Sequence, residues 1–173
     1  MFELTKSVLT SFGIHQVYAA FEHNQGFQAV CNLNPDLVIL DWTGPPLDSM
    51  ALVKKIRSDP DSPNPFVPII LMSGYSQKER VLKARDSGIT TFMAKPYTAK
   101  ALYQRIEQLV EKPRQFVKSD HYFGPDRRSL RKEEYKGAER REDMPPAEEK
   151  RSARKTAEAM KQRLETHKDQ KQD

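Results

Sequence analysis

The stretch that decides the fold is Asn34-Pro35-Asp36-Leu37-Val38-Ile39-Leu40-Asp41-Trp42. Four apolar residues stand in a row between two carboxylates, which is typical of a strand covered on both faces in a parallel sheet. The Asn34-Pro35 pair marks the end of a preceding helix, because the residue before a proline disfavours helical backbone. The stretch therefore predicts a parallel strand that is covered on both faces and carries Asp41 at its carboxyl end.

On both sides of this stretch, the chain from Met1 to Lys112 alternates between helical and strand patterns. Gly13 and Gly88 each follow an apolar helical pattern and are expected to end it. Alternating strands and helices with short connections predict an α/β domain with an open, parallel, doubly wound sheet, in which function sits at the carboxyl ends of the strands. Helices are expected over 4–12, before Asn34, after a cap at Asp48, and over 77–87 and 98–111, and strands over 15–20, 36–41, 68–72 and 90–94.

Charge is distributed unevenly along the 173 residues. The chain has 29 Lys+Arg and 24 Asp+Glu, a formal charge of +5 and a pI near 9.3. Positions 1–112 hold 12 basic and 11 acidic side chains, whereas the shorter segment 113–173 holds the other 17 and 13. Such a polar segment buries too little apolar surface to offset the entropy of ordering its backbone, about 1–2 kcal/mol per residue. We therefore expect a domain over 1–112 and a basic, largely disordered tail over 113–173.

Composition also excludes several classes of protein. The apolar runs are far shorter than the roughly 20 residues needed to span a bilayer, and the start lacks a secretory signal. The single Cys31 excludes a disulfide framework, and the four histidines are scattered rather than set at zinc-ligand spacing. There is no glycine-rich phosphate loop and no nucleophile elbow. We expect a cytoplasmic protein without a membrane partner.

Three polar residues stand where predicted strands end. Asp41 ends one strand, Ser73 follows the next, and Lys95 follows the last, just before Pro96. Their spacing of 32 and 22 positions is about one strand–helix unit each, so parallel strands would bring the three side chains to one edge. These groups suit a phosphoryl group, because the carboxylate can act as nucleophile, the hydroxyl can donate to an oxygen, and the lysine can neutralise the developing charge.

Three segments resemble the later signatures of the response-regulator receiver family of two-component signalling. They are residues 34–42, Ile69-Ile70-Leu71-Met72-Ser73-Gly74 and Phe92-Met93-Ala94-Lys95-Pro96-Tyr97. The resemblance covers about residues 1–112 and implies a flavodoxin-like receiver fold.

The resemblance also implies roles for single residues. Asp41 would be the phosphoacceptor, which receives its phosphoryl group from the histidine of a sensor kinase or a phosphotransfer protein. Ser73 would be the switch hydroxyl and Lys95 the counter-charge of the phosphate. Phe92 occupies the family's aromatic switch position, although an ordinary half-buried strand residue is the alternative. The Lys95–Pro96 peptide bond would be cis.

The magnesium site implied by the resemblance is incomplete. A receiver opens with an apolar strand that ends in two acidic residues, and these hold Mg²⁺ together with the phosphoacceptor. This sequence begins at Met1 inside the predicted first helix, so the strand and its acidic pair are absent from it. Asp41 and the backbone carbonyl of Thr43 remain as ligands, a poor site for an ion that needs near-octahedral oxygen ligation.

Two explanations for the absence of the opening strand and its acidic pair stay open. The natural start lies upstream, or the chain is a degenerate receiver that no longer takes phosphate by the usual route. In the family's strand order the absent strand lies between the strands predicted here at 15–20 and 36–41. Its absence would leave unpaired backbone groups on two inner edges.

Two further residues are placed beside the phosphate by the resemblance. Thr43 and Tyr75 each stand two residues beyond a site residue, where the family tunes the rate of phosphate hydrolysis. Tyr75 is bulky enough to shield the phosphoryl group from water, and simple coverage of the rim is the alternative.

The predicted tail contains an approximate repeat. Residues 122–128 and 135–141 share the pattern Tyr-x-Gly-x-acid-Arg-Arg. This pattern is either a short motif for an acidic partner or a phosphate backbone, or part of a solubilising tail. Interleaved acidic residues argue against nucleic acid as a partner, because they cancel much of the positive field. Residues 147–166 are good helix formers, and they predict a short helix that is marginal in isolation.

The leading functional hypothesis is a single-domain response regulator of a two-component phosphorelay. It would be phosphorylated on Asp41 and would signal by protein–protein contact with an unknown downstream target, through the face around Phe92 and the last helix. Such a protein is not an enzyme with a free substrate, and at most it phosphorylates and dephosphorylates itself. The alternative is a degenerate, phosphate-independent, receiver-like adaptor that acts through its surface or its basic tail. Nucleic acid binding by the tail is the third and least favoured hypothesis.

Overall fold

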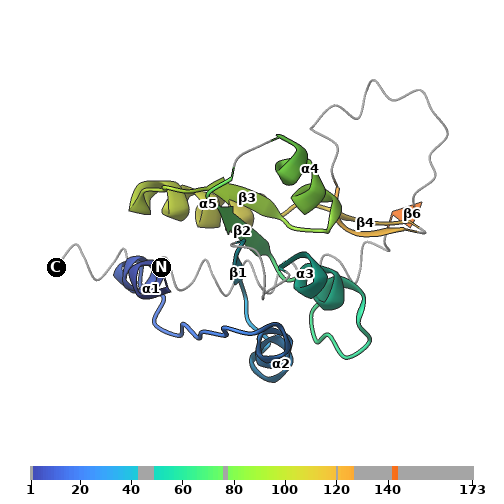
Figure 1. Cartoon of the computed structure of the whole chain (residues 1–173), viewed down its shortest axis with the longest axis horizontal. Coiled ribbons are helices and arrows are strands. Elements are labelled where there is room, and N and C mark those ends of the chain that lie inside the picture. Colours follow the sequence, from blue (N-terminus) through green and yellow to red (C-terminus); the bar gives the residue numbers. More distant parts are fainter. Residues whose placement is uncertain (1, 43–48, 76–77, 120, 127–141, 144–173) are drawn as a thin grey trace.

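The computed structural model describes residues 2–42, 49–75, 78–119, 121–126 and 142–143 (Figure 1). The main sheet is parallel with strand order β1-β2-β3, which confirms the predicted α/β class. Its strands are β1 (Val38–Asp41), β2 (Ile69–Ser73) and β3 (Thr91–Ala94), and its helices are α1 (Phe2–Ser11), α2 (His23–Leu33), α3 (Ser49–Ser58), α4 (Lys78–Asp86) and α5 (Ala99–Glu111).

Local signals account for the ends of two helices. Asn34 adopts the left-handed conformation, with φ of 41°, directly after α2, and asparagine tolerates this conformation better than most residues. The Thr98 hydroxyl accepts a hydrogen bond from the amide of Ala101 at 3.1 Å and so caps the start of α5. The predicted cap at Asp48 lies outside the described residues.

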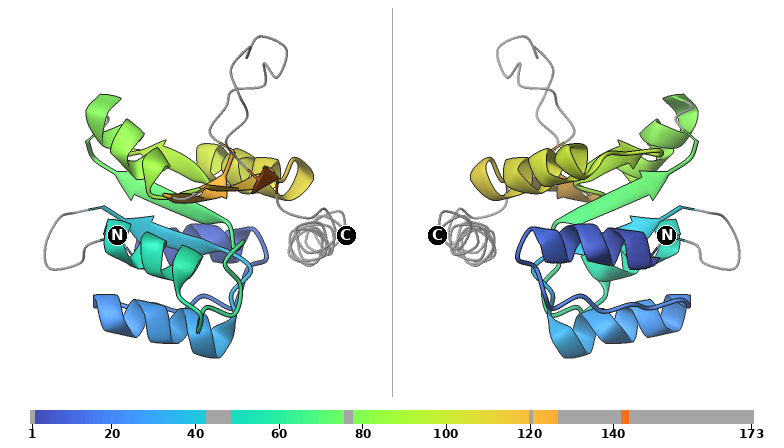
Figure 2. Two further views of the ribbon diagram at one scale, coloured as in Figure 1. Left: turned by 90° about the vertical axis from the view of Figure 1, so that its right-hand side faces the viewer. Right: turned by 90° about the vertical axis from the view of Figure 1, so that its left-hand side faces the viewer.

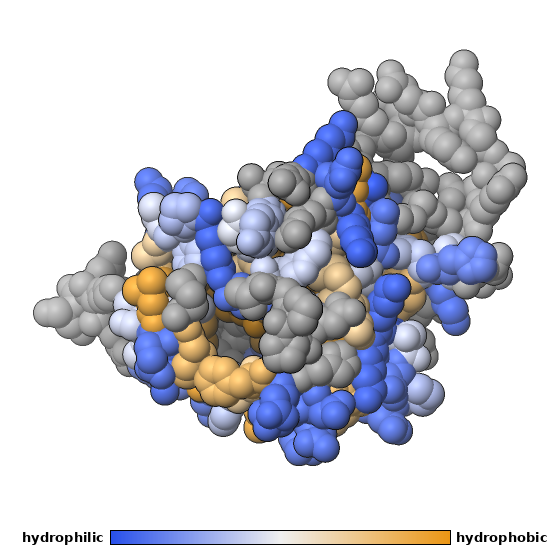
Figure 3. All heavy atoms as spheres, viewed as in Figure 1, coloured by the Kyte–Doolittle hydropathy of each residue, from blue (hydrophilic) through white to orange (hydrophobic). Residues whose placement is uncertain are grey.

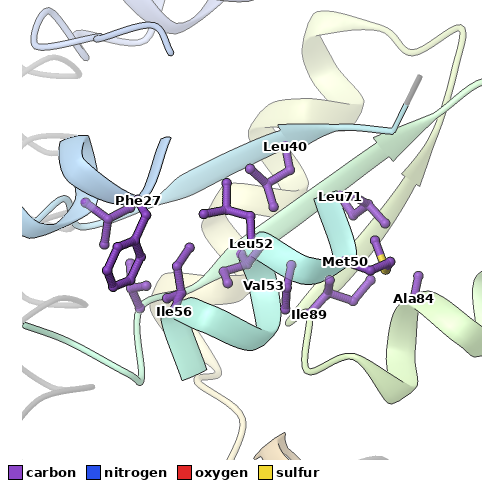
Figure 4. Close-up of a cluster of buried hydrophobic side chains, with 12 residues drawn as sticks. Phe27, Leu40, Met50, Leu52, Val53, Ile56, Leu71, Ala84 and Ile89 are labelled. Carbon is purple, nitrogen blue, oxygen red and sulfur yellow. The ribbon is translucent and has the colours of Figure 1, made fainter. Parts of the chain in front are cut away.

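Two hydrophobic clusters lie on opposite faces of the sheet. On one face, α1 and α5 pack against residues such as Ile70 and Met72. On the other, Val53, Ile56 and Leu71 belong to a cluster formed with α2, α3 and α4 (Figure 4). All five residues of β2 are buried, because helices cover both of its faces.

The strand predicted over 15–20 does not form, and this prediction is wrong. The segment runs between α1 and α2 as irregular backbone, and the described residues place no strand beside it (Figure 1). A strand is held by hydrogen bonds to a neighbour, so a pattern of strand-forming residues is not enough. Between this segment and β1 lies a cavity of about 790 Å³ instead.

A second, small sheet lies beyond α5. It has the order β5-β4-β6 and is antiparallel, with strands β4 (Phe116–Ser119), β5 (Tyr122–Pro125) and β6 (Glu142–Asp143). The hairpin of β4 and β5 packs against α3 and the loop before β2 (Figure 2). Its Val117 is 1% exposed, so it is part of a packed core.

The sequence predicts a largely disordered tail after Lys112. This prediction is wrong for β4 and β5, which form an ordered hairpin within that segment. Contacts among three aromatic rings hold the hairpin in place. The centroid of the Phe66 ring lies 5.2 Å from that of Phe116 and 5.5 Å from that of Phe123. A two-stranded hairpin is at best marginally stable alone, and this one is stabilised by apolar surface on the main domain. Of the two repeat copies, the first begins as β5, while the second, with the helix predicted over 147–166, lies outside the described residues.

A buried arginine joins this hairpin to the main domain. Arg57 of α3 is 4% exposed, and its guanidinium donates to the carbonyls of Gly88, Pro65 and Val67 at 2.9, 2.6 and 2.8 Å. The guanidinium also lies 5.1 Å from the centroid of the Phe116 ring. Burial lowers the pKa of Arg57 to about 9, so the side chain is cationic at neutral pH.

Gly124→Ala is expected to weaken the docking of the hairpin. A Cβ at this position would lie 2.9 Å from the Cα of Gly88 and 2.7 Å from the Tyr122 hydroxyl. The backbone contact can be relieved only by moving β5 away, at a cost of about 1–3 kcal/mol. Hydrogen exchange measures this directly, since the amides of β4 and β5 should lose protection in the variant.

Gly74→Ala is the matched control, because a Cβ at Gly74 meets nothing within 4 Å. It should leave the protection of the hairpin unchanged. Equal protection of β4 and β5 in both variants would argue that the close approach of Gly88 and Gly124 is not needed for docking.

Candidate functional site

The structure brings the ends of the three parallel strands to one edge of the sheet. Asp41 ends β1, Ser73 ends β2 and Lys95 directly follows β3. The ammonium of Lys95 donates to Asp41 Oδ2, and the amide of Lys95 donates to the carbonyl of Ser73 at 2.8 Å. The carboxylate of Asp41 and the ammonium of Lys95, which were predicted to meet, are therefore in contact. Ser73 ends the strand that lies between β1 and β3.

The carboxylate of Asp41 is only partly accessible. Its side chain is 36% exposed and that of Lys95 is 16% exposed. Oδ2 is bonded to Lys95, whereas Oδ1 is buried and has no hydrogen-bond partner among the described residues. An unpaired buried carboxylate oxygen is costly, so a donor or cation at Oδ1 would be favourable.

Sequence reasoning did not identify Ser49 as a residue that supports this site. Ser49 is the first residue of α3 and is fully buried, and its hydroxyl donates to the backbone carbonyl of Asp41 at 2.9 Å. The bond ties the start of α3 to the end of β1. Serine is common at the start of a helix because it can cap the backbone there. Its presence in the sequence therefore did not point to this site.

A second contact supports the loop that carries Lys95. The Lys95–Pro96 peptide bond is cis, as the resemblance implied. The hydroxyl of Tyr97, which follows this bond, lies 2.7 Å from the Thr5 hydroxyl of α1. The position of the loop is therefore shared between the sheet and the first helix.

The structure places the remaining predicted residues around this edge or outside the described part. Phe92 of β3 is half-buried and packs against the cluster formed with α3 and α4. Tyr75 is 53% exposed, and its amide donates to the Ser73 hydroxyl oxygen at 3.1 Å. Thr43, with its backbone carbonyl, lies outside the described residues.

The described residues do not fit a complete magnesium site. No group of three or more His, Cys, Asp and Glu side chains within them could hold a metal ion. Asp41 is the one carboxylate that ends a strand of the main sheet, and one of its oxygens is already paired with Lys95. Mg²⁺ prefers several oxygen ligands in octahedral geometry, and the arrangement supplies too few of them.

Within the part of the chain that the structure describes, no helix is long and apolar enough to cross a bilayer.

Comparison with known proteins decides the family. The family model of the response regulator receiver domain matches residues 1–107. The chain belongs to this family. Among curated relatives, the receiver is 29% identical over 108 residues to chemotaxis protein CheY1 of Helicobacter pylori, covering 62% of this chain and 86% of the relative. It is 22% identical to chemotaxis protein CheY-3 of Vibrio cholerae, covering 65% and 85%.

Solved structures agree on the flavodoxin-like receiver fold. A putative response regulator from Chloroflexus aurantiacus aligns with a TM-score of 0.56 and 23% identity, over 62% of this chain and 85% of that one. The receiver domain of sensor histidine kinase PA1611 from Pseudomonas aeruginosa aligns with a TM-score of 0.53 and 24% identity, over 61% and 84%. That domain has a magnesium ion coordinated in its active-site cleft. These likenesses show the fold, and the match of the family model over residues 1–107 identifies it as a receiver domain of two-component signalling.

Proposed function

We propose that this receiver accepts a phosphoryl group on Asp41 from the histidine of a sensor kinase or a phosphotransfer protein. The observation that carries the proposal is the contact of the Lys95 ammonium with the Asp41 carboxylate at the carboxyl edge of the sheet. The pair combines a nucleophile with a fixed positive charge, as phosphoryl transfer requires.

The chemical step is a displacement at phosphorus. An oxygen of the Asp41 carboxylate forms the new P–O bond, the P–N bond of phosphohistidine breaks, and the electron pair and a proton remain with the histidine ring. The added phosphate increases the negative charge at this edge. Lys95 offsets part of this charge, and the Ser73 hydroxyl has a proton to donate to a phosphate oxygen.

Signalling would follow from contact with another protein. Phe92 lies on the strand next to Ser73 and is half-buried, so a shift of Ser73 toward the phosphate would open space for the ring to turn inward. The face formed by β3 and α5 would then present a changed surface to a downstream protein. In this proposal no free substrate is consumed, and the receiver acts in the cytoplasm.

One observation favours a second candidate function. Because the described residues hold no cluster of acidic ligands for a metal ion, a phosphate-independent adaptor is the alternative. In that case the surface of the receiver would bind its partner in one constant state. The two candidates differ in whether Asp41 reacts at all.

The test is incubation of the full chain with a small phosphodonor, across a range of magnesium concentrations, followed by intact mass measurement. The proposal expects addition of one phosphoryl group. No addition at any magnesium concentration would overturn it and favour the adaptor.

A further inference from the structure

The peptide unit that joins Asp41 to Trp42 is held from two sides. Its N–H group, which belongs to Trp42, donates to the carbonyl of Met72 in β2 at 2.7 Å. Its C=O group, which belongs to Asp41, accepts a hydrogen bond from the hydroxyl of Ser49 at 2.9 Å. The N–H and C=O groups of a trans peptide lie in one plane and point in opposite directions. The plane that follows the Asp41 Cα is therefore fixed between β2 and the start of α3.

The serine that holds this peptide stands on a well-packed helix. Ser49 is fully buried, and among the described residues its hydroxyl bonds to Asp41 and not to the first turn of α3. Six of the ten residues of α3 are buried. Hydrophilic residues dominate the lower right of the view in Figure 3, where α2 and α3 lie, so the solvated side of these helices faces outward. A donor on a helix packed in this way keeps its place relative to the sheet.

The side chain of Asp41 is restrained less than its backbone. Lys95 contacts Oδ2, whereas Oδ1 has no hydrogen-bond partner among the described residues. A contact at one oxygen fixes that oxygen but not the direction of the whole carboxylate. The backbone that carries the side chain must supply the remaining restraint, and the bond from Ser49 acts on that backbone.

We propose that Ser49 is a positioning residue for phosphoryl transfer, because its hydroxyl holds the Asp41 backbone in the orientation from which the carboxylate attacks phosphorus. This inference rests on the proposed function, in which Asp41 is the phosphoacceptor. Displacement at phosphorus needs the attacking oxygen at a defined distance and angle, and a small misplacement lowers the rate manyfold. Ser49 is fully buried and cannot touch a phosphodonor, so it acts through Asp41.

The test compares the full natural chain with Ser49→Ala, which removes the hydroxyl and keeps a small, helix-forming residue. Each protein is incubated with a small phosphodonor, and its intact mass is followed over time. The rate of phosphorylation should fall about three- to tenfold in Ser49→Ala. The final product should still carry one phosphoryl group, because the nucleophile is intact.

Tryptophan fluorescence provides a second readout that a general loss of stability would not move. Trp42 is the one tryptophan of the chain, and it is half-buried directly after Asp41. Because the peptide that carries its N–H loses one of its two restraints in Ser49→Ala, the emission maximum of the folded variant should shift. The shift should be present before any phosphodonor is added.

Ser62→Ala is the matched control. Ser62 is also a buried serine, and its hydroxyl donates to the backbone carbonyl of Ile56 at 2.7 Å. It lies in the loop that leads to the amino end of β2, opposite the edge that carries Asp41. Its loss should lower stability in urea to a similar extent but leave the phosphorylation rate and the Trp42 emission unchanged.

Three outcomes would overturn the inference. Equal slowing of Ser49→Ala and Ser62→Ala would show that lost stability explains the effect. The natural rate in Ser49→Ala would show that the hydroxyl does not position Asp41, and it would leave the proposed function intact. A natural chain that takes no phosphoryl group would overturn the proposed function, and this inference with it.

Discussion

Asp41→Asn is expected to abolish phosphoryl transfer to this receiver. The amide that replaces the carboxylate is not a nucleophile at neutral pH, and it leaves the Lys95 ammonium without its anionic partner. The expected change is from one phosphoryl group to none in the intact mass after incubation with a small phosphodonor. No other described residue at this edge offers a carboxylate in contact with Lys95.

Loss of folding would not explain that result. The Asp41–Lys95 pair is partly exposed, and such pairs contribute about 1 kcal/mol or less to stability. Asp36→Asn is the matched control, since it removes a carboxylate that lies two residues before the opposite end of the same strand. It should be phosphorylated like the natural chain. Continued phosphorylation of Asp41→Asn would move the acceptor to another residue and refute its assignment.

Arg57→Met is expected to destabilise the protein by about 2 kcal/mol or more, because it leaves buried acceptors unpaired at about 1–3 kcal/mol each. The substitution keeps an unbranched apolar stem but removes the donors to three carbonyls, those of Gly88, Pro65 and Val67. Relief of the desolvation of a buried charge offsets only part of this loss. Urea unfolding measures the change.

The effect should extend to the hairpin, because the guanidinium also contacts the Phe116 ring. Protection of the β4 and β5 amides should therefore fall together with the overall stability. Arg85→Met is the matched control: Arg85 is exposed on α4 and pairs with Asp86, and its loss should change stability by less than about 0.5 kcal/mol. Similar stabilities for the two variants would show that the Arg57 hydrogen bonds contribute little net free energy.

Much of the fold and part of the site could be predicted from local patterns. The continuous apolar runs at β1 and β2 predicted parallel strands, and the ends of the predicted strands placed Asp41 and Lys95 at one edge of the sheet. These predictions worked because each depends on residues close in sequence, together with the rule that parallel strands end at one edge. The supporting contact of Ser49 with Asp41 could not be predicted, since it joins two elements across a loop.

The sequence by itself determined which segments can be strands and helices and which side chains can meet at the end of a parallel sheet. The tertiary structure decided where the ordered chain continues and where a strand fails to form. Residues 15–20 lack a strand because no described neighbour supplies hydrogen bonds, and β4 and β5 form because Phe66 and Arg57 supply a surface. A strand is stabilised by what lies beside it, and that partner is distant in sequence.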